Sequence, residues 1–409
     1  MKRPGYKWTL LAFLFVGYFV AQGSRQMYNA ALPQIKLDFA ATDLQLGMVG
    51  TVFAAVFGLS LMASGIMADT LGRARVLMLG TALFSVGIFA SGFAGGPVWM
   101  IASYGVLNAL GQCCVAPASL ALISRHHRET RSVAMAVFQG AVYSGVILGS
   151  LFAGVLAGMG EGLWRWAFWG VGGFGLAWAL VLKRFVREDD GGSPSGADGA
   201  VSAREAFLAL WRKPTAVMVA VAFSFFIYST LGIRMWTPMF MVRSFGGVGT
   251  AAAALHAVLW LNAGALVSCL VTARVIDRVG VRHPRVRLIS SAVGFLLAAV
   301  PILLVARAGS VAECCVALTL LGVATGICEA AHYPAMFDCI APRYHAAAAG
   351  LTGALAFVFG SAAPALLGWM NDRLSMRASI ASLAIFYLAG AATLLPAIFH
   401  FFRKDYVRQ

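Results

Sequence analysis

The chain has 409 residues, of which 60% are hydrophobic and only 11% charged, and its formal net charge is +15 at pH 7. Soluble domains carry roughly 25% charged residues, so this composition excludes an ordinary soluble domain. Apolar runs of about 20 residues, long enough to cross a ~30 Å hydrocarbon core, recur along the whole chain. Backbone polar groups in lipid must be satisfied within each segment, so these runs predict helices.

Twelve transmembrane helices are predicted, and the fold class is therefore an all-α membrane protein. The expected spans are roughly 8–32, 45–68, 76–95, 98–124, 134–158, 164–182, 214–241, 250–273, 288–306, 312–340, 346–370 and 379–402. With a cytoplasmic N-terminus, 23 of the 31 Lys and Arg residues fall on the inner side. This asymmetry follows the positive-inside rule and predicts a plasma (inner) membrane protein with both termini cytoplasmic. The basic charge therefore reflects orientation in the bilayer and does not indicate a nucleic-acid partner.

The first span carries a polar face in its middle. Arg25, Tyr28 and Asn29 lie three and four residues apart, so they share one side of a helix. A cation inside the bilayer is expensive and normally faces a polar cavity or a partner group. We expect Arg25 to bind an anionic group, with Tyr28 and Asn29 supplying hydrogen bonds; the alternative is a structural arginine paired across an interface.

A glycine-rich loop joins the second and third spans and is echoed in the second half of the chain. It contains Gly65, Asp69, Gly72 and Arg73, and Asp277 and Gly280 follow Asp69 and Gly72 by the same 208 positions. This offset is close to half the chain and indicates two copies of one unit. Glycine at position 72 is expected to permit a tight turn.

The pattern Gly-x-x-x-Asp-x-x-Gly-Arg in this loop resembles the signature loop of the major facilitator superfamily. The first copy departs from the family at Thr70 and Ala74, and the second has Val281 where Arg is usual. The resemblance implies two pseudo-symmetric six-helix bundles, residues 1–184 and 213–409, that alternate access to a central site. It also implies a conformational role for the six loop residues. Arg25 precedes Pro33 by eight, which resembles the anion:cation symporters and the organophosphate:phosphate antiporters.

The fourth and fifth spans add polar side chains to the first bundle. Gln112 stands where the anion:cation symporters usually have an acid, and Gln139 and Tyr143 share one face of the next span. All three are candidate hydrogen-bond donors to substrate, although simple packing is an equal alternative for Gln139 and Tyr143. The fifth span is also rich in small residues, which predicts close packing against another helix.

Residues 185–212 form a central loop between the bundles, expected on the cytoplasmic side. Its first part has the composition of a flexible linker. Residues 202–211 predict a short amphipathic helix at the membrane surface, with Ser202 as the N-cap and Glu205 three residues later.

The second bundle supplies a second set of polar residues. Arg234 and Asn262 are candidate substrate ligands; Arg234 lies near the symmetry-related position of Arg25, or else snorkels to the outer surface. Glu329 lies in the middle of the tenth span, three residues before His332, and we expect this pair to carry a proton. The alternatives are a Glu329 locked structurally to Arg25 or His332, and metal binding by the Glu-x-x-His spacing, which lacks further ligands.

The predicted function is a monomeric secondary transporter of a small organic anion, a carboxylate or sugar acid, coupled to proton symport. No cofactor, metal or catalytic set is expected, so an enzyme is disfavoured. A phosphate-ester exchanger and a drug or metabolite efflux antiporter remain open as alternatives. A non-transporting membrane sensor on the same fold is the alternative from another class.

Overall fold

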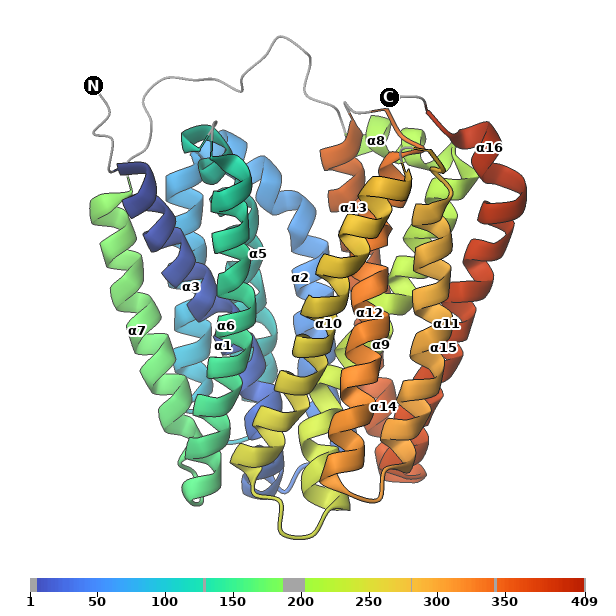
Figure 1. Ribbon diagram of the computed structural model, residues 1–409. Helices are drawn as coiled ribbons and strands as arrows, with labels where there is room; N and C mark the ends of the chain where they lie inside the picture. Colours follow the sequence, from blue (N-terminus) through green and yellow to red (C-terminus); the bar gives the residue numbers. More distant parts are fainter. Residues whose placement is uncertain (1–5, 128–129, 187–202, 281, 342–343, 408–409) are drawn as a thin grey trace. The chain divides into compact units, whose positions relative to one another are not determined.

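The computed structural model describes residues 6–127, 130–186, 203–280, 282–341 and 344–407, and every regular element in these ranges is a helix (Figure 1). The chain divides into two compact units, Met1–Ala197 with Gly247–Leu255 and Asp198–Gly246 with His256–Gln409. The predicted all-α class is confirmed.

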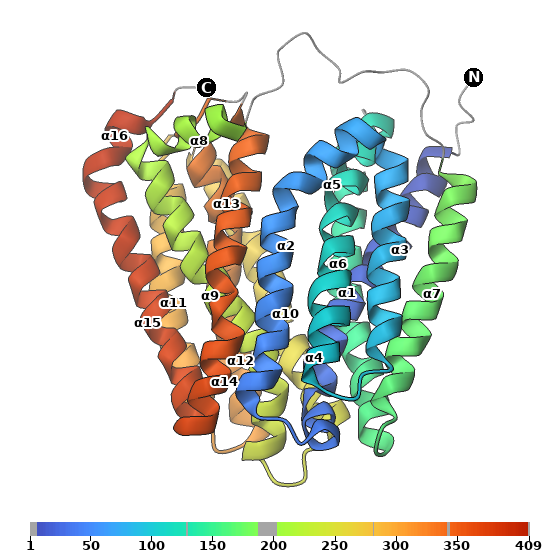
Figure 2. The ribbon, with the colours of Figure 1, turned by 180° about the vertical axis from the view of Figure 1, so that it is seen from behind.

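The first unit carries the helices of the first half of the chain. They are α1 (Tyr6–Phe39), α2 (Asp43–Leu71), α3 (Arg73–Ser91), α4 (Pro97–Met100), the π-helix η1 (Ile101–Asn108), α5 (Ala109–His126), α6 (Arg131–Met159) and α7 (Trp164–Phe185). In this unit α1 packs along α6, and α5 packs between α2 and α3 (Figure 2).

The second unit carries the helices of the second half. They are α8 (Ala203–Trp211), α9 (Pro214–Ser244), α10 (Thr250–Gly280, of which the part up to Leu255 belongs to the first unit), α11 (Val286–Arg307), α12 (Val311–Phe337), α13 (His345–Gly360), α14 (Ala362–Arg373), α15 (Met376–Pro396), the π-helix η3 (Ala397–Phe401) and α16 (Phe402–Asp405). The helix predicted at 202–211 is present as α8. The rest of the predicted central loop largely lies outside the described residues.

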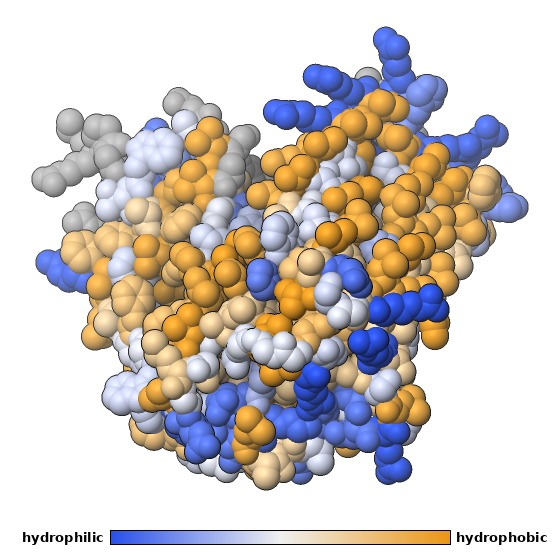
Figure 3. Space-filling model, turned by 60° about the horizontal axis from the view of Figure 1, so that its bottom comes forward, coloured by the Kyte–Doolittle hydropathy of each residue, from blue (hydrophilic) through white to orange (hydrophobic). Residues whose placement is uncertain are grey.

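Eleven segments of the described chain are long and apolar enough to cross a membrane. Three of them join consecutive helices: Pro97–His126, Ala347–Arg373 and Met376–Asp405. Helix α1 is long enough at 34 residues, but the polar residues around Arg25 lower its hydropathy. With α1, the segments account for the twelve predicted spans. Figure 3 shows hydrophobic residues over much of the face in view and hydrophilic ones gathered mainly toward its upper and lower margins.

Local sequence sets where the helices begin and turn. Thr42 starts α2 with a capping box, in which its hydroxyl accepts from the Gln45 N–H at 3.2 Å and its own N–H donates to the Gln45 side chain at 3.0 Å. Gly72 alone separates α2 from α3. Its φ of 95° is a backbone conformation that residues with a Cβ rarely adopt. The tight turn predicted at this glycine is confirmed.

Close helix contacts in the first unit depend on glycine. A Cβ at Gly149 of α6 would lie 2.4 Å from the Cα of Gly23 in α1, and one at Gly145 would lie 2.5 Å from the Phe19 carbonyl oxygen. The two backbones therefore touch directly beside the polar stretch of α1. This confirms the close packing predicted for the small residues of the fifth span.

Candidate functional site

Arg25 lies half-buried in α1, over two aromatic rings that α2 provides. Its guanidinium carbon is 5.1 Å from the ring centre of Phe53 and 4.8 Å from that of Phe57. A cation over an aromatic face is stabilised by the ring quadrupole, the more so when water is removed. The rings therefore hold the charge in place in a stretch where a bare cation would be costly.

A third aromatic side chain completes this arrangement. The Tyr104 hydroxyl donates to the Arg25 carbonyl oxygen at 2.7 Å, and its ring lies 5.3 Å from Phe53 and 4.9 Å from Tyr28. Tyr104 belongs to η1, an eight-residue π-helical segment. Such segments are rare and often occur at functional sites, because the extra residue redirects side chains. In this chain, the segment brings Tyr104 against the backbone of Arg25.

The other polar residues predicted near Arg25 form hydrogen bonds inside the first unit. The buried Tyr28 donates its hydroxyl proton to the Leu46 carbonyl at 2.9 Å, and Asn29 donates to Gln26 at 2.9 Å. The buried Gln112 amide nitrogen lies 3.0 Å from the Ala21 carbonyl and 2.9 Å from Asn108 Oδ1. Tyr28 and Gln112 thus connect α1 to α2 and α5, and this fixes the position of Arg25.

The two candidates on α6 have more open surroundings. Gln139 is exposed and Tyr143 is half-buried, and α6 lies along α1. Their role in substrate binding stays a prediction.

Arg234 in the second unit is directed towards a buried amide. Its guanidinium donates to Asn262 Oδ1 at 3.1 Å, and the Asn262 amide donates to the Val258 carbonyl at 2.6 Å. Asn262 is 4% exposed. The guanidinium therefore points across from α9 to α10, rather than along α9 towards its end.

Glu329 and His332 are three residues apart on α12 but have different surroundings. Glu329 is exposed, and its carboxylate lies near enough to Arg234 for the two charges to attract each other. His332 is 3% exposed and stacks on Phe223 at 4.0 Å, and its Nε2 has no hydrogen-bond partner among the described residues. The Glu329 side chain is thus exposed at the surface of α12, while His332 is buried against Phe223.

The loop residues predicted to act in conformational switching are described only in part. Gly72 forms the turn, Arg73 is half-buried at the start of α3, and Gly280 is buried at the end of α10. The side chains of Asp69 and Asp277 and the surroundings of Gly65 lie outside the described residues. Their role as a switch stays a prediction.

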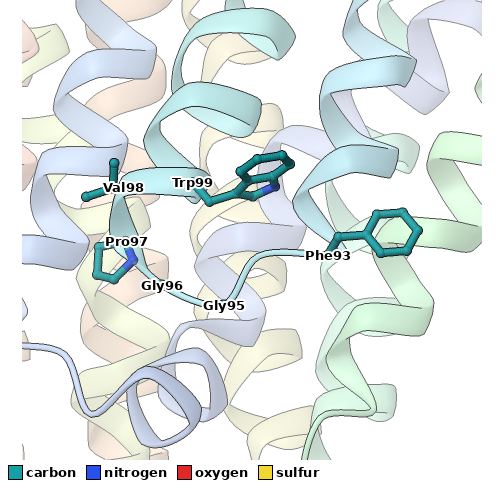
Figure 4. A pocket seen from close by; sticks show the side chains of 6 residues that line it. All are labelled: Phe93, Gly95, Gly96, Pro97, Val98 and Trp99. Atoms are coloured by element: carbon teal, nitrogen blue, oxygen red, sulfur yellow. The ribbon is translucent and has the colours of Figure 1, made fainter.

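A separate cavity of about 450 Å³ lies at the turn between α3 and α4 (Figure 4). Glycine, Pro97 and the apolar side chains of Phe93, Val98 and Trp99 line it. It offers no charged group for an anion. Among the described residues, no cluster of His, Cys, Asp or Glu could hold a metal ion.

Several residues around the two arginines were not predicted from the sequence. Phe53, Phe57 and Tyr104 surround Arg25, and the fully buried Tyr387 lies in Coulombic range of Arg234 and Glu329. The spacing of Phe53 and Phe57, four residues apart on one helix face, was an available signal. Nothing local marks Tyr104 or Tyr387, because their contacts come from distant parts of the chain.

Comparisons with known proteins agree with this architecture. The probable sulfoacetate transporter SauU of Cupriavidus necator is 26% identical over 388 residues, which cover 89% of this chain and 87% of that protein. The lincomycin resistance protein of Streptomyces lincolnensis is 31% identical over 167 residues, which cover 41% of this chain but only 34% of that protein.

The fold matches solved transporter structures over its whole length. The crystal structure of a bacterial homolog of the human lysosomal transporter Spinster superposes with a TM-score of 0.86 at 19% identity, covering 100% of both chains. The sequence model described as Major Facilitator Superfamily matches residues 14–364. The chain therefore belongs to the Major Facilitator Superfamily, and it is an integral multi-pass membrane transporter rather than an enzyme.

Proposed function

We propose that this transporter moves a small organic anion, a carboxylate or sugar acid, across the plasma membrane together with protons. The observation that best supports this proposal is the position of Arg25, a cation within the first span. Two aromatic rings and a network of buried hydrogen bonds hold it in place. Arginine binds carboxylates with two parallel hydrogen bonds, so a fixed guanidinium is suited to select an anion. Its neighbours Tyr28, Asn29 and Gln112 keep this group oriented, and Gln139 and Tyr143 contribute hydrogen bonds to the substrate.

Arg25 is the principal anion-binding group in this proposal, and Arg234 has a different role. The Glu329 carboxylate is near Arg234 and offsets its positive charge. One guanidinium nitrogen of Arg234 donates a hydrogen bond to Asn262. A cation whose charge is offset by a nearby carboxylate attracts an anion less strongly. Arg234 therefore responds to the charge state of Glu329, and substrate engages it best when that carboxylate is protonated.

Glu329 is the proposed proton carrier, because it is an exposed carboxylate within a span and Arg234 is a cationic neighbour. Protonation removes a charge that is expensive in the bilayer, so proton binding and the conformational change are coupled. His332 is enclosed against Phe223 and positions the helix beside it. The first unit thus supplies the anion-binding cation and the second unit the proton carrier.

Similarity to the sulfoacetate transporter supports an anionic substrate, since sulfoacetate carries a carboxylate and a sulfonate. The positive-inside distribution of Lys and Arg supports cytoplasmic termini.

Uptake into proteoliposomes tests the proposal, with sulfoacetate and a panel of sugar acids as the probes. We expect an inward proton gradient to drive accumulation, and Arg25→Ala to lower kcat/KM for the anion by at least about 30-fold, since a charged hydrogen-bonded pair is worth ~2–5 kcal/mol. Lys7→Met, which removes a cation near the start of the same helix, is the control and should transport normally. Wild-type affinity for the anion in Arg25→Ala would reject the anion-binding role.

Drug efflux is the second candidate, because part of the chain is similar to the lincomycin resistance protein. Efflux predicts that lincomycin is expelled from loaded proteoliposomes whatever residue stands at position 25. Export of lincomycin by both wild type and Arg25→Ala, without uptake of any organic anion, would favour this candidate.

A further inference from the structure

A second cavity, of about 360 Å³, lies in the second unit away from Arg234 and Glu329. Its lining comes from α8, the turn that precedes α9, the junction of α12 with α13, and the C-terminal segment. Figures 1 and 2 show α8, the start of α13 and α16 at the same end of this unit. Since α9 and α12 are spans that begin or end here, the cavity lies at the depth of the lipid headgroups.

The charged residues in the lining favour an anionic ligand. Arg212 and Lys213 provide two cations, and Glu205 provides one carboxylate. Arg212 is exposed, and its guanidinium has no hydrogen bond or ion pair to any residue that the structure describes. Lys213 donates to the backbone oxygen of Asp405 at 3.2 Å, which holds its ammonium group at the cavity. The lining is therefore net positive.

An apolar surface continues from this cavity. On α8, Phe207 is 41% exposed, Leu208 37% and Trp211 63%, and the rings of Phe207 and Trp211 stack at 5.6 Å. Leu208 also lines the cavity. Apolar faces of short surface helices insert into the boundary between headgroups and acyl chains, where tryptophan is enriched. The ligand that fits both features has an anionic head and a hydrocarbon tail.

We propose that this cavity binds the headgroup of an anionic phospholipid, with its phosphate at Arg212 and Lys213 and its acyl chains along Phe207, Leu208 and Trp211. A free phosphate ion would use the cations but leave the apolar surface uncovered, so the lipid is the ligand that accounts for both. This binding is independent of the transported substrate.

Binding of phosphatidylglycerol to the purified full chain tests the proposal, measured by native mass spectrometry from detergent with phosphatidylcholine as the neutral reference. We expect phosphatidylglycerol to bind at least about fivefold more tightly than phosphatidylcholine, and Arg212→Gln to lose about fivefold in affinity for it, the usual effect of one cation at an anionic surface. Arg212→Lys should retain most of the binding.

Arg403→Gln removes an exposed cation from α16 at the same end of the unit and serves as the matched control. It should bind phosphatidylglycerol as wild type does. Wild-type binding by Arg212→Gln, or an equal loss in both variants, would overturn the site. Competition by glycerol 3-phosphate at the same concentration as the lipid would also overturn it, because it would show a site for free phosphate.

Discussion

Replacing Gly149 with alanine tests the packing that positions Arg25. The added Cβ would lie 2.4 Å from the Gly23 Cα and 2.6 Å from its carbonyl oxygen. Carbon atoms in contact are about 3.5–4.0 Å apart, so α1 and α6 must separate by roughly 1 Å. Gly23 is two residues before Arg25 in α1, so this displacement reaches the proposed anion-binding residue.

The cost of the substitution follows from two opposing terms. Overpacking costs about 1–3 kcal/mol, while replacing a helical glycine with alanine recovers roughly 0.5–1 kcal/mol of backbone entropy. The difference is a net loss of about 0–2.5 kcal/mol in stability, and the contact of 2.4 Å places this substitution in the upper half of that range. For a cooperative unit of some 200 residues, this lowers Tm by about 2–4 °C per kcal/mol.

Gly140 on the same helix provides a matched control. A Cβ there would meet only the Phe15 ring, at the ordinary contact distance of 3.8 Å. Thermal unfolding of the detergent-purified variants, followed by intrinsic fluorescence, should give Gly140→Ala a Tm equal to or above that of wild type and Gly149→Ala a lower one. Equal Tm values for the two variants would refute the close contact between α1 and α6.

Three further predictions concern single residues. Asp405→Ala should destabilise the protein by about 1.5–3 kcal/mol in thermal unfolding, because the buried carboxylate accepts from the Thr215 N–H at 2.8 Å where α9 begins; Asp405→Asn, which keeps an acceptor oxygen, should recover part of this loss. Burial, with the nearby Asp405, raises the pKa of the Cys339 thiol to about 12, so about one thiol in 10⁴ is ionised at pH 8. A variant that retains only this cysteine should therefore react with iodoacetamide only above about pH 11. Rapid labelling at pH 8 would contradict the structure. Phe57→Leu should raise KM for the anion roughly threefold to tenfold in uptake assays, because it removes a ring 4.8 Å from the Arg25 guanidinium, and an unchanged KM would show that this contact does not position the cation.

The helical spans were predictable because their signals are local. Apolar runs set the spans, Gly72 marked the turn, and residues 202–211 had the pattern of the helix now seen as α8. Each of these depends on residues close together in the chain, where hydrophobicity and backbone conformation decide the outcome.

The surroundings of the candidate site were not predictable to the same degree. Arg25 was identified from its cost in the bilayer, but the rings of Phe53 and Phe57 reach it through the packing of α2 on α1. Arg234 was expected either to face a cavity or to snorkel, and its bond to Asn262 depends on how α9 and α10 face each other. The three-residue spacing of Glu329 and His332 also did not reveal that the first side chain is exposed and the second buried.

Proton movement that accompanies substrate transport is the most direct test of the account. In weakly buffered proteoliposomes, adding the transported anion should make the external medium more alkaline as protons enter with it. Glu329→Gln should abolish this signal and gradient-driven accumulation while still allowing the anion to bind. Glu313→Gln, a matched change in the first turn of α12, should keep both. Alkalinisation by Glu329→Gln equal to that of wild type, or uptake by wild type with no change in pH, would contradict the account.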